Sequence, residues 1–148
     1  MSKIAIIRLK GLFSISPTIE KTLECMRLNK LYSCAIITLT PSSKGMLQIA
    51  KDVVAYGEID EKAMALLLSK RGKGVDGKKL SATKKPAEIE KLASEFLASE
   101  KSLEDFGVKN LFALSPPKGG FDGSRKSGTP YGPLGKNADI SGLIAKMA

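Results

Sequence analysis

Basic residues are concentrated in two segments that also contain glycine. Residues 70–85 hold seven lysines or arginines against one acid, Asp76, with three glycines among them. Residues 116–137 hold four lysines or arginines against one acid, Asp122. Glycine lets backbone N–H groups reach phosphates beside the lysine side chains, which suits folded RNA. A solvated charged loop without a ligand is the other interpretation, and charge alone does not decide between them.

A second chemistry is suggested by residues 72–78, GKGVDGK, which satisfy the first seven positions of the phosphate-binding loop pattern G-x-x-x-x-G-K. The next position in that pattern is Ser or Thr, which holds magnesium, and here it is Lys79. The preceding residues are typical of a helix instead of a buried strand, and the following ones are a poor helix start. A nucleotide-hydrolysing enzyme is therefore the weaker alternative.

Most other enzyme chemistry lacks its residues. The sequence has no histidine, which excludes Ser-His-Asp triads and Cys-His zinc sites. Its two cysteines, Cys25 and Cys34, lie in apolar segments, and we expect both to be small buried core residues. Acidic pairs such as Glu104 and Asp105 fall where solvated surface is expected. We therefore expect no catalytic residue, no metal ion and no cofactor.

The whole chain is basic, with 24 Lys and Arg against 15 Asp and Glu in 148 residues and a formal net charge of +9. This balance favours a polyanionic partner. No apolar run approaches the roughly 20 residues of a membrane-spanning helix, and the N-terminus lacks a signal-type stretch. We therefore expect a cytoplasmic protein that does not bind membranes.

Aromatic residues are scarce, with three Tyr, five Phe and no Trp. Phe13, Phe121 and Tyr131 lie in expected loops, where an aromatic side chain either stacks on a base or packs as a plug against the core. Both interpretations stay open for these three residues. The scarcity of aromatic residues favours RNA binding by shape and phosphate contact over sequence-specific binding of single strands.

The elements that must position the basic loops follow from apolar periodicity. Residues 3–9, 33–40 and 55–59 predict short, mostly buried strands. Two amphipathic helices are predicted between them, one starting at Pro17 and one following Pro41. This order predicts an α/β fold, a small βαβαβ core sheet covered on one face by two helices, as in a ferredoxin-like sandwich, with right-handed crossovers.

The rest of the chain predicts a mostly helical C-terminal extension. Its expected elements are helices at 60–69, 86–97 and 140–147 and a short strand at 111–114. We divide the chain into a core, residues 1–60, and an extension packed on it, residues 61–148, which carries the basic loops 70–85 and 116–137. We expect loop 70–85 to be flexible and to hold no core residues. The acidic segment 87–110 indicates a face turned away from the polyanion.

Four stretches resemble the ribosomal protein thirty family of the large subunit, which is numbered seven in eukaryotes. The core has LTPSSKGM at residues 39–46 and AYG at 55–57, and the extension has SKRGKG at 69–74 and SPPKGG at 115–120. The resemblance spans essentially the whole chain, whereas bacterial members stop near Ile59. The missing basic N-terminal arm of eukaryotic members favours an archaeal source.

The resemblance implies a structural, non-catalytic component of the large ribosomal subunit. Its partners would be large-subunit (23S-type) rRNA, with 5S rRNA as a further candidate, and neighbouring ribosomal proteins, without a small-molecule substrate. By resemblance, the RNA-contact candidates are Arg8, Lys10, Lys30, Lys44, Lys70, Arg71, Lys73, Lys118 and Arg125. The charge of the basic loops adds Lys78, Lys79 and Lys126.

Two points qualify this assignment. At the position of Lys118, members of this family commonly have arginine. Lysine can still contact a phosphate there, but it cannot make the bidentate contact of a guanidinium. A free RNA-binding regulator or assembly factor would have a similar sequence, and it remains the alternative from the binding class.

Overall fold

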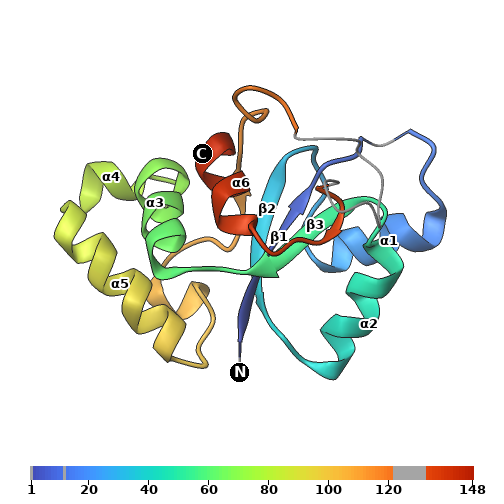
Figure 1. Cartoon of the computed structure of the whole chain (residues 1–148). Coiled ribbons are helices and arrows are strands. Elements are labelled where there is room, and N and C mark those ends of the chain that lie inside the picture. The colour runs from blue at the N-terminus through green and yellow to red at the C-terminus, as the bar shows by residue number, and fades with distance from the viewer. Residues whose placement is uncertain (1, 12, 122–132) are drawn as a thin grey trace.

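The computed structural model describes residues 2–11, 13–121 and 133–148. Its first part alternates strands and helices as the sequence predicts (Figure 1). These elements are β1 (Lys3–Arg8), α1 (Pro17–Cys25), β2 (Ser33–Thr38), α2 (Pro41–Ala50) and β3 (Val54–Glu58). Across the described ranges, no helix has the length and apolar character needed to cross a bilayer.

β1 is the central strand of a five-stranded sheet in the order β4-β2-β1-β3-β5, where β4 is Phe112–Ala113 and β5 is Gly135–Lys136. It pairs antiparallel with both neighbours, placing Ile6 opposite Ala35 of β2 and Tyr56 of β3. β2 and β3 therefore run in the same direction with β1 between them. The connection through α2 is thus a crossover, whereas α1 joins antiparallel neighbours and the expected crossover there is wrong.

The two predicted helices α1 and α2 cover one face of the sheet. Successive side chains of a strand point to opposite faces of the sheet. Ile6 of β1 points to the face that these helices cover, and it packs with Leu23 of α1 and Leu47 of α2. α2 begins at a reciprocal cap, in which the Ser43 amide donates to the Thr40 hydroxyl (3.1 Å) and the Thr40 amide to the Ser43 hydroxyl (2.7 Å). Proline at the first position of each helix adds to this start signal.

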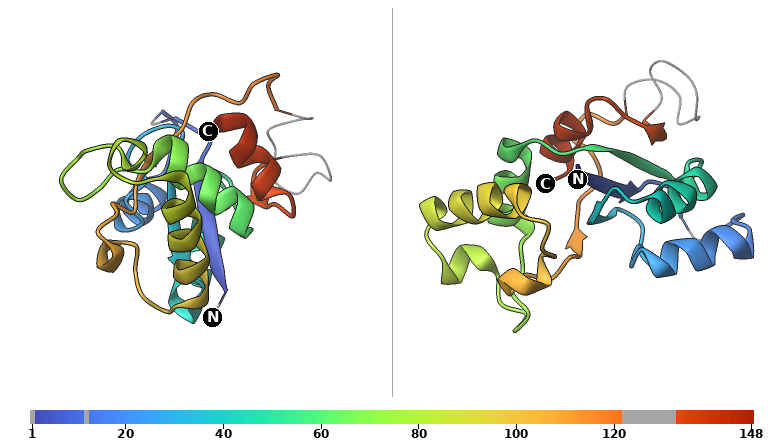
Figure 2. Two further views of the ribbon diagram at one scale, coloured as in Figure 1. Left: turned by 90° about the vertical axis from the view of Figure 1, so that its left-hand side faces the viewer. Right: turned by 90° about the horizontal axis from the view of Figure 1, so that it is seen from below.

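The extension covers the other face. Its elements are α3 (Glu61–Arg71), α4 (Leu80–Thr83), α5 (Pro86–Ala98), the 3-10 turn η1 (Glu104–Phe106), β4, β5 and α6 (Ile140–Met147). Ile7 and Cys34 of the sheet share a core cluster with Leu67 of α3, Phe96 of α5 and Ile144 of α6. The sheet therefore lies between two helical layers, α1 and α2 on one side and the extension on the other (Figure 2).

The extension is joined to the sheet by strand pairing and by close contacts. β4 pairs with β2 and β5 runs parallel to β3. Gly57 of β3 lies against the strap, the short segment around Asn137 that leads into α6. A Cβ at Gly57 would be 2.2 Å from the carbonyl oxygen of Asn137. The buried Lys3 ammonium donates to the Lys101 carbonyl (2.9 Å) and lies 4.5 Å from the centre of the Phe96 ring. The division of the chain at residue 60 stays a prediction.

Candidate nucleic-acid interface

One end of the sheet brings together loops from the core and the extension. The Tyr32 amide donates to the Arg8 carbonyl (2.9 Å), and the Leu114 amide donates to the Tyr32 carbonyl (3.0 Å). Arg71, at the end of α3, donates from its guanidinium to the Ser115 hydroxyl. We call this region the loop end of the sheet. It comprises residues 8–11, 13–16, 26–33, 70–71 and 114–118.

Cationic side chains from both parts of the chain gather at the loop end. The exposed lysines are Lys10 and Lys30 from the core and Lys70 and Lys118 from the extension. The segments of the loop end contain no acidic residue. Arg27 is partly compensated, since it forms an exposed ion pair with Glu104 of η1. The excess of cations over nearby acids creates a positive potential that attracts a polyanion.

Arg8 is the exception among the candidates at this end. Its side chain is 1% exposed, and its guanidinium donates to three backbone carbonyls, those of Lys10 (2.9 Å), Leu28 (2.8 Å) and Gly11 (3.3 Å). A buried guanidinium engaged in this way presents no donor to a phosphate in solvent. Arg8 is therefore not a surface residue in this structure, where it holds the loop that follows β1, and its contact with RNA stays a prediction.

Within the basic segment 70–85, residues 73–79 form an ordered hairpin between α3 and α4, and not the flexible loop that the composition suggests. The Gly74 amide donates to the Lys78 carbonyl (2.8 Å), and the Val75 amide donates to the Gly107 carbonyl (3.0 Å). Leu80, in α4, is 4% exposed and belongs to the core. The expectation of a segment without core residues is also wrong, because Leu80 is buried in the core.

The hairpin presents lysines in a geometry that differs from a phosphate-binding loop. Lys73, Lys78 and Lys79 are exposed on it. A helix, α3, leads into residues 72–78, whereas the nucleotide-binding motif needs a strand there. Gly72 is required for packing, since a Cβ at this position would be 2.6 Å from a methyl carbon of Leu80. Gly72, the first glycine of the pattern, thus has a structural use.

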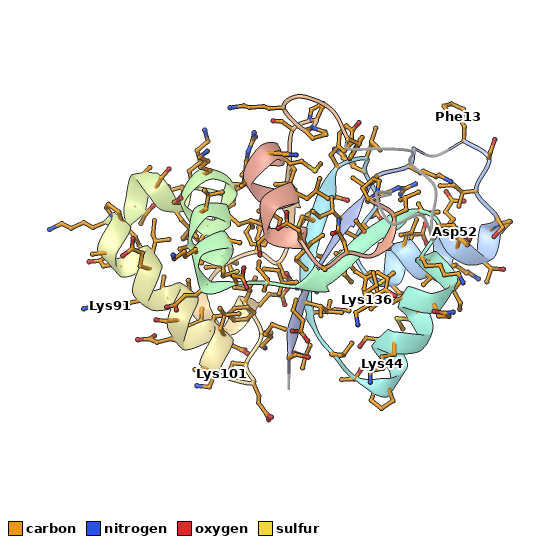
Figure 3. The ribbon with its side chains drawn as sticks, in the orientation of Figure 1. Phe13, Lys44, Asp52, Lys91, Lys101 and Lys136 are labelled. Atoms are coloured by element: carbon orange, nitrogen blue, oxygen red, sulfur yellow. The ribbon has the colours of Figure 1, made fainter. Side chains whose placement is uncertain are left out.

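Lys44 lies apart from the loop end. It is exposed in the first turn of α2, which follows the opposite end of β2. Lys44 and Lys136 flank a groove lined by Ile4, Leu47 and Tyr56, and both are visible beside α2 in Figure 3. The structure therefore does not bring Lys44 together with Lys10 and Lys30.

The groups that could do other chemistry are few. Burial raises the pKa of the Cys34 thiol to about 12, which keeps it protonated and unreactive. Cys25 is exposed, so its expected place in the core is wrong. In the described part of the chain, no group of three or more His, Cys, Asp or Glu side chains is arranged to hold a metal ion.

Comparison with known proteins decides the family. The family model for ribosomal protein L30p/L7e matches residues 4–54. Three proteins named large ribosomal subunit protein uL30 match nearly the full length: 39% identity to that of Archaeoglobus fulgidus (97% of this chain, 98% of the relative), 38% to that of Thermofilum pendens (99% and 99%) and 35% to that of Methanothrix thermoacetophila (97% and 98%). The chain belongs to the L30p/L7e family.

The two comparisons cover different parts of the fold. The L30p/L7e model matches β1 through the start of β3, the part of the chain that forms the central strands, α1 and α2. The archaeal relatives also match the extension, because 97–99% of this chain aligns with them. The full-length resemblance noted in the sequence is thereby confirmed.

The remaining candidates divide by position. Arg125 and Lys126 lie outside the described residues, as does Tyr131. Phe121 is partly buried and packs against the core cluster, as a plug does. Phe13 differs from it, because it is 94% exposed at the loop end.

Sequence reasoning missed one basic residue of the loop end. Arg27 follows α1 with φ 61°, a backbone conformation uncommon for a residue other than glycine. In the sequence it looks like the last turn of a helix. Only its left-handed backbone and its pairing with Glu104 show that it belongs to the turn between α1 and β2.

Proposed function

We propose that this chain is a structural constituent of the large ribosomal subunit in the cytoplasm, where it binds and stabilises packed large-subunit rRNA through phosphate contacts and catalyses no reaction. Membership of the L30p/L7e family supports the ribosomal role. The observation that carries the RNA-binding proposal is the loop end, where segments from the core and the extension present exposed lysines and contain no acidic residue of their own.

The proposed contacts fall into three groups. The first is the loop end, with Lys10, Lys30, Lys70, Arg71 and Lys118. The second is the hairpin, with Lys73, Lys78 and Lys79, and the third is Lys44 on α2. Arg125 and Lys126 are included on sequence alone. Such contacts give affinity and position without reading bases.

The partners follow from this mode of binding. We propose large-subunit rRNA of the 23S type as the main partner, with 5S rRNA as a further candidate and neighbouring large-subunit proteins beside it. A single chain with basic groups on two parts of its fold can hold two RNA helices together, since each phosphate contact reduces the repulsion between them.

Salt-dependent binding of the purified protein to protein-free large-subunit rRNA tests this proposal. If about six cations engage phosphates, the logarithm of the association constant falls with the logarithm of salt concentration with a slope of roughly −4 to −5. Changing Lys10, Lys30, Lys70 and Lys118 to Gln lowers the magnitude of that slope by about 3. A slope near zero for the wild type contradicts the proposal.

A matched variant controls for net charge. Lys21, Lys62, Lys91 and Lys101 are exposed on α1, α3, α5 and the turn after α5, and none is a proposed contact. Their change to Gln alters the net charge equally and is expected to leave the wild-type slope nearly unchanged. An equal effect of both variants would mean that overall charge, and not the loop end, determines binding.

A further inference from the structure

Phe13 is exposed to a degree that the folded chain does not explain. Its side chain is 94% exposed, against 44–57% for the other exposed large apolar residues of the described ranges. It projects outward from the loop between β1 and α1 (Figure 3). Leaving a phenyl group in water forgoes the favourable free energy that its burial would give. Among the described residues Phe13 therefore has no packing role, unlike Phe121.

The loop that carries Phe13 is held firmly at its base. The Arg8 guanidinium ties the carbonyls of Lys10 and Gly11 to that of Leu28 in the neighbouring turn. The amides of Leu9 and Lys10 both donate to the carbonyl of Val53 (3.0 and 3.3 Å). A buried cation shared among backbone carbonyls fixes two loops relative to each other. Phe13 is thus presented from a fixed base.

Backbone strain is concentrated at the same end of the sheet. Three non-glycine residues in the described chain have positive φ: Ser14 at 62°, Arg27 at 61° and Tyr32 at 60°. Ser14 follows Phe13, and the other two bound the turn that Arg8 holds. Left-handed conformations of such residues cost free energy and persist where the surrounding structure determines them, which is common at ligand-binding loops.

The charge around Phe13 indicates what kind of partner it meets. Lys10 and Lys30 are exposed in the two loops, and neither residues 9–16 nor residues 26–33 contain an acid. An exposed aromatic ring on a loop that also carries a lysine, next to a second loop with another, suits a nucleic-acid base flanked by phosphates. The base stacks on the ring and the cations neutralise the backbone. A purely apolar pocket on a protein would not use these cations.

We propose that Phe13 stacks on an unpaired base of large-subunit rRNA, while Lys10 and Lys30 contact phosphates beside that base. Arg8 acts as a positioning residue that holds the loop for this contact. The inference rests on the proposed rRNA-binding function and adds to it a specific mode of contact, which phosphate binding by lysines does not require.

The absence of tryptophan from the sequence gives a direct test. The variant Phe13→Trp carries a single tryptophan, and stacking on a base is expected to quench its fluorescence when protein-free large-subunit rRNA is added. Ala87→Trp, at an exposed position of α5, is the matched control and is expected to keep its fluorescence. Quenching at both positions, or at neither, overturns the stacking contact.

Affinity measurements separate stacking from apolar contact. Phe13→Ala is expected to keep the wild-type melting temperature, because the side chain is exposed, and to bind rRNA about 5- to 100-fold more weakly. Phe13→Leu keeps the apolar character and lacks the aromatic face, so it is expected to be nearly as weak. Wild-type affinity of Phe13→Leu, or of Phe13→Ala, overturns the inference.

The same measurements distinguish this inference from the proposed function. If Phe13→Ala binds as well as wild type and both retain a steep salt dependence, the stacking contact is wrong and the phosphate-binding function stands. If the wild type itself binds protein-free rRNA without salt dependence, the proposed function fails first. A weakened Phe13→Ala with an unchanged salt slope supports the stacking contact, since the lost interaction is not ionic.

Discussion

At the scale of single residues, Arg8 and Arg27 of the loop end have roles that their residue type does not reveal. Arg8 is buried and donates to the carbonyls of Lys10, Gly11 and Leu28, whereas Arg27 is exposed beside Glu104. A basic residue at the end of a predicted strand suggests a surface contact, and the sequence contains no local signal for the three carbonyls that surround Arg8. Its function follows from tertiary structure alone.

The role of Arg8 predicts a loss of stability on a conservative change. Arg8→Lys is expected to lower the free energy of unfolding by about 1–3 kcal/mol, because one ammonium cannot reach all three carbonyls in the geometry of the planar guanidinium. Urea denaturation measures this, with Lys10→Gln at the exposed neighbouring position as the control. An Arg8→Lys variant of wild-type stability with weakened RNA binding would instead place Arg8 on the RNA.

Cys34 predicts a specific pH dependence. Burial raises its pKa to about 12 in the folded state, above the value of 9.0 for a free thiol. Below pH about 9 the thiol is protonated in both states and contributes no pH dependence. Between about 9 and 12 the unfolded state loses this proton and the folded state keeps it, so the contribution of Cys34 to stability falls as pH rises.

Thiol labelling checks this behaviour. At pH 8 a thiol reagent is expected to modify the exposed Cys25 quickly and Cys34 only on unfolding. The variant Cys25→Ser isolates the second reaction. Rapid labelling of Cys34 in that variant, without denaturant, would show that its side of the sheet opens readily.

At the scale of elements, the extension depends on a narrow contact at β3. Gly57 faces the strap that leads into α6, and a Cβ would lie 2.2 Å from the Asn137 carbonyl and 3.1 Å from the Cβ of Ile140. The Asn137 amide also donates to the carbonyl of Tyr56 (2.8 Å). The position of α6 on the sheet therefore depends on a residue without a side chain.

Gly57→Ala is therefore expected to destabilise the protein by about 1–3 kcal/mol, since the strap must move to admit the methyl group. Gly45→Ala is the matched control. Gly45 lies within α2 and a Cβ there meets nothing within 4 Å, so alanine is expected to stabilise by about 0.5–1 kcal/mol. Thermal melting of both variants measures the difference, and equal effects of the two would contradict the close contact at β3.

Elements with local signals were predictable and those made by distant contacts were not. The central strands and both core helices follow from alternating apolar residues and from Pro17 and Pro41 at helix starts. β5 has two residues, Gly135–Lys136, and exists because it pairs with β3, which no local pattern encodes. The glycines and lysines at 73–79 predict a loop, whereas the order of this hairpin comes from its packing on residues 107–109.

At the scale of the whole molecule, cationic and acidic surfaces are carried by different elements. The loop end and the hairpin present exposed lysines, whereas α5 and the following turn present Glu88, Glu90 and Glu95 among other exposed acids. α5 lies in the outer helical layer of the extension, on the other side of the sheet from α1 (Figure 1). The segment 87–110 nevertheless touches both cationic regions, through the ion pair of Arg27 with Glu104 and through the bonds of the hairpin to residues 107–109. One face turned away from a polyanion therefore stays a prediction.

The hairpin and the adjoining end of α3 allow a second test at this scale. Changing Lys70, Lys73, Lys78 and Lys79 to Glu is expected to leave the fold intact, because these side chains are exposed and Leu80 is retained, and to abolish stable association with rRNA. Circular dichroism and melting temperature check the fold, and incorporation into reconstituted subunits checks association. Incorporation at the wild-type level would refute this expectation.

Sedimentation of a cell lysate tests the central claim most directly. The lysate is separated on sucrose gradients at low and then high salt, and the protein is quantified by mass spectrometry against other large-subunit proteins. The proposed role predicts that it comigrates with the large subunit at the same stoichiometry and persists at high salt. Free or substoichiometric protein would contradict a structural role and indicate an assembly factor or a regulator.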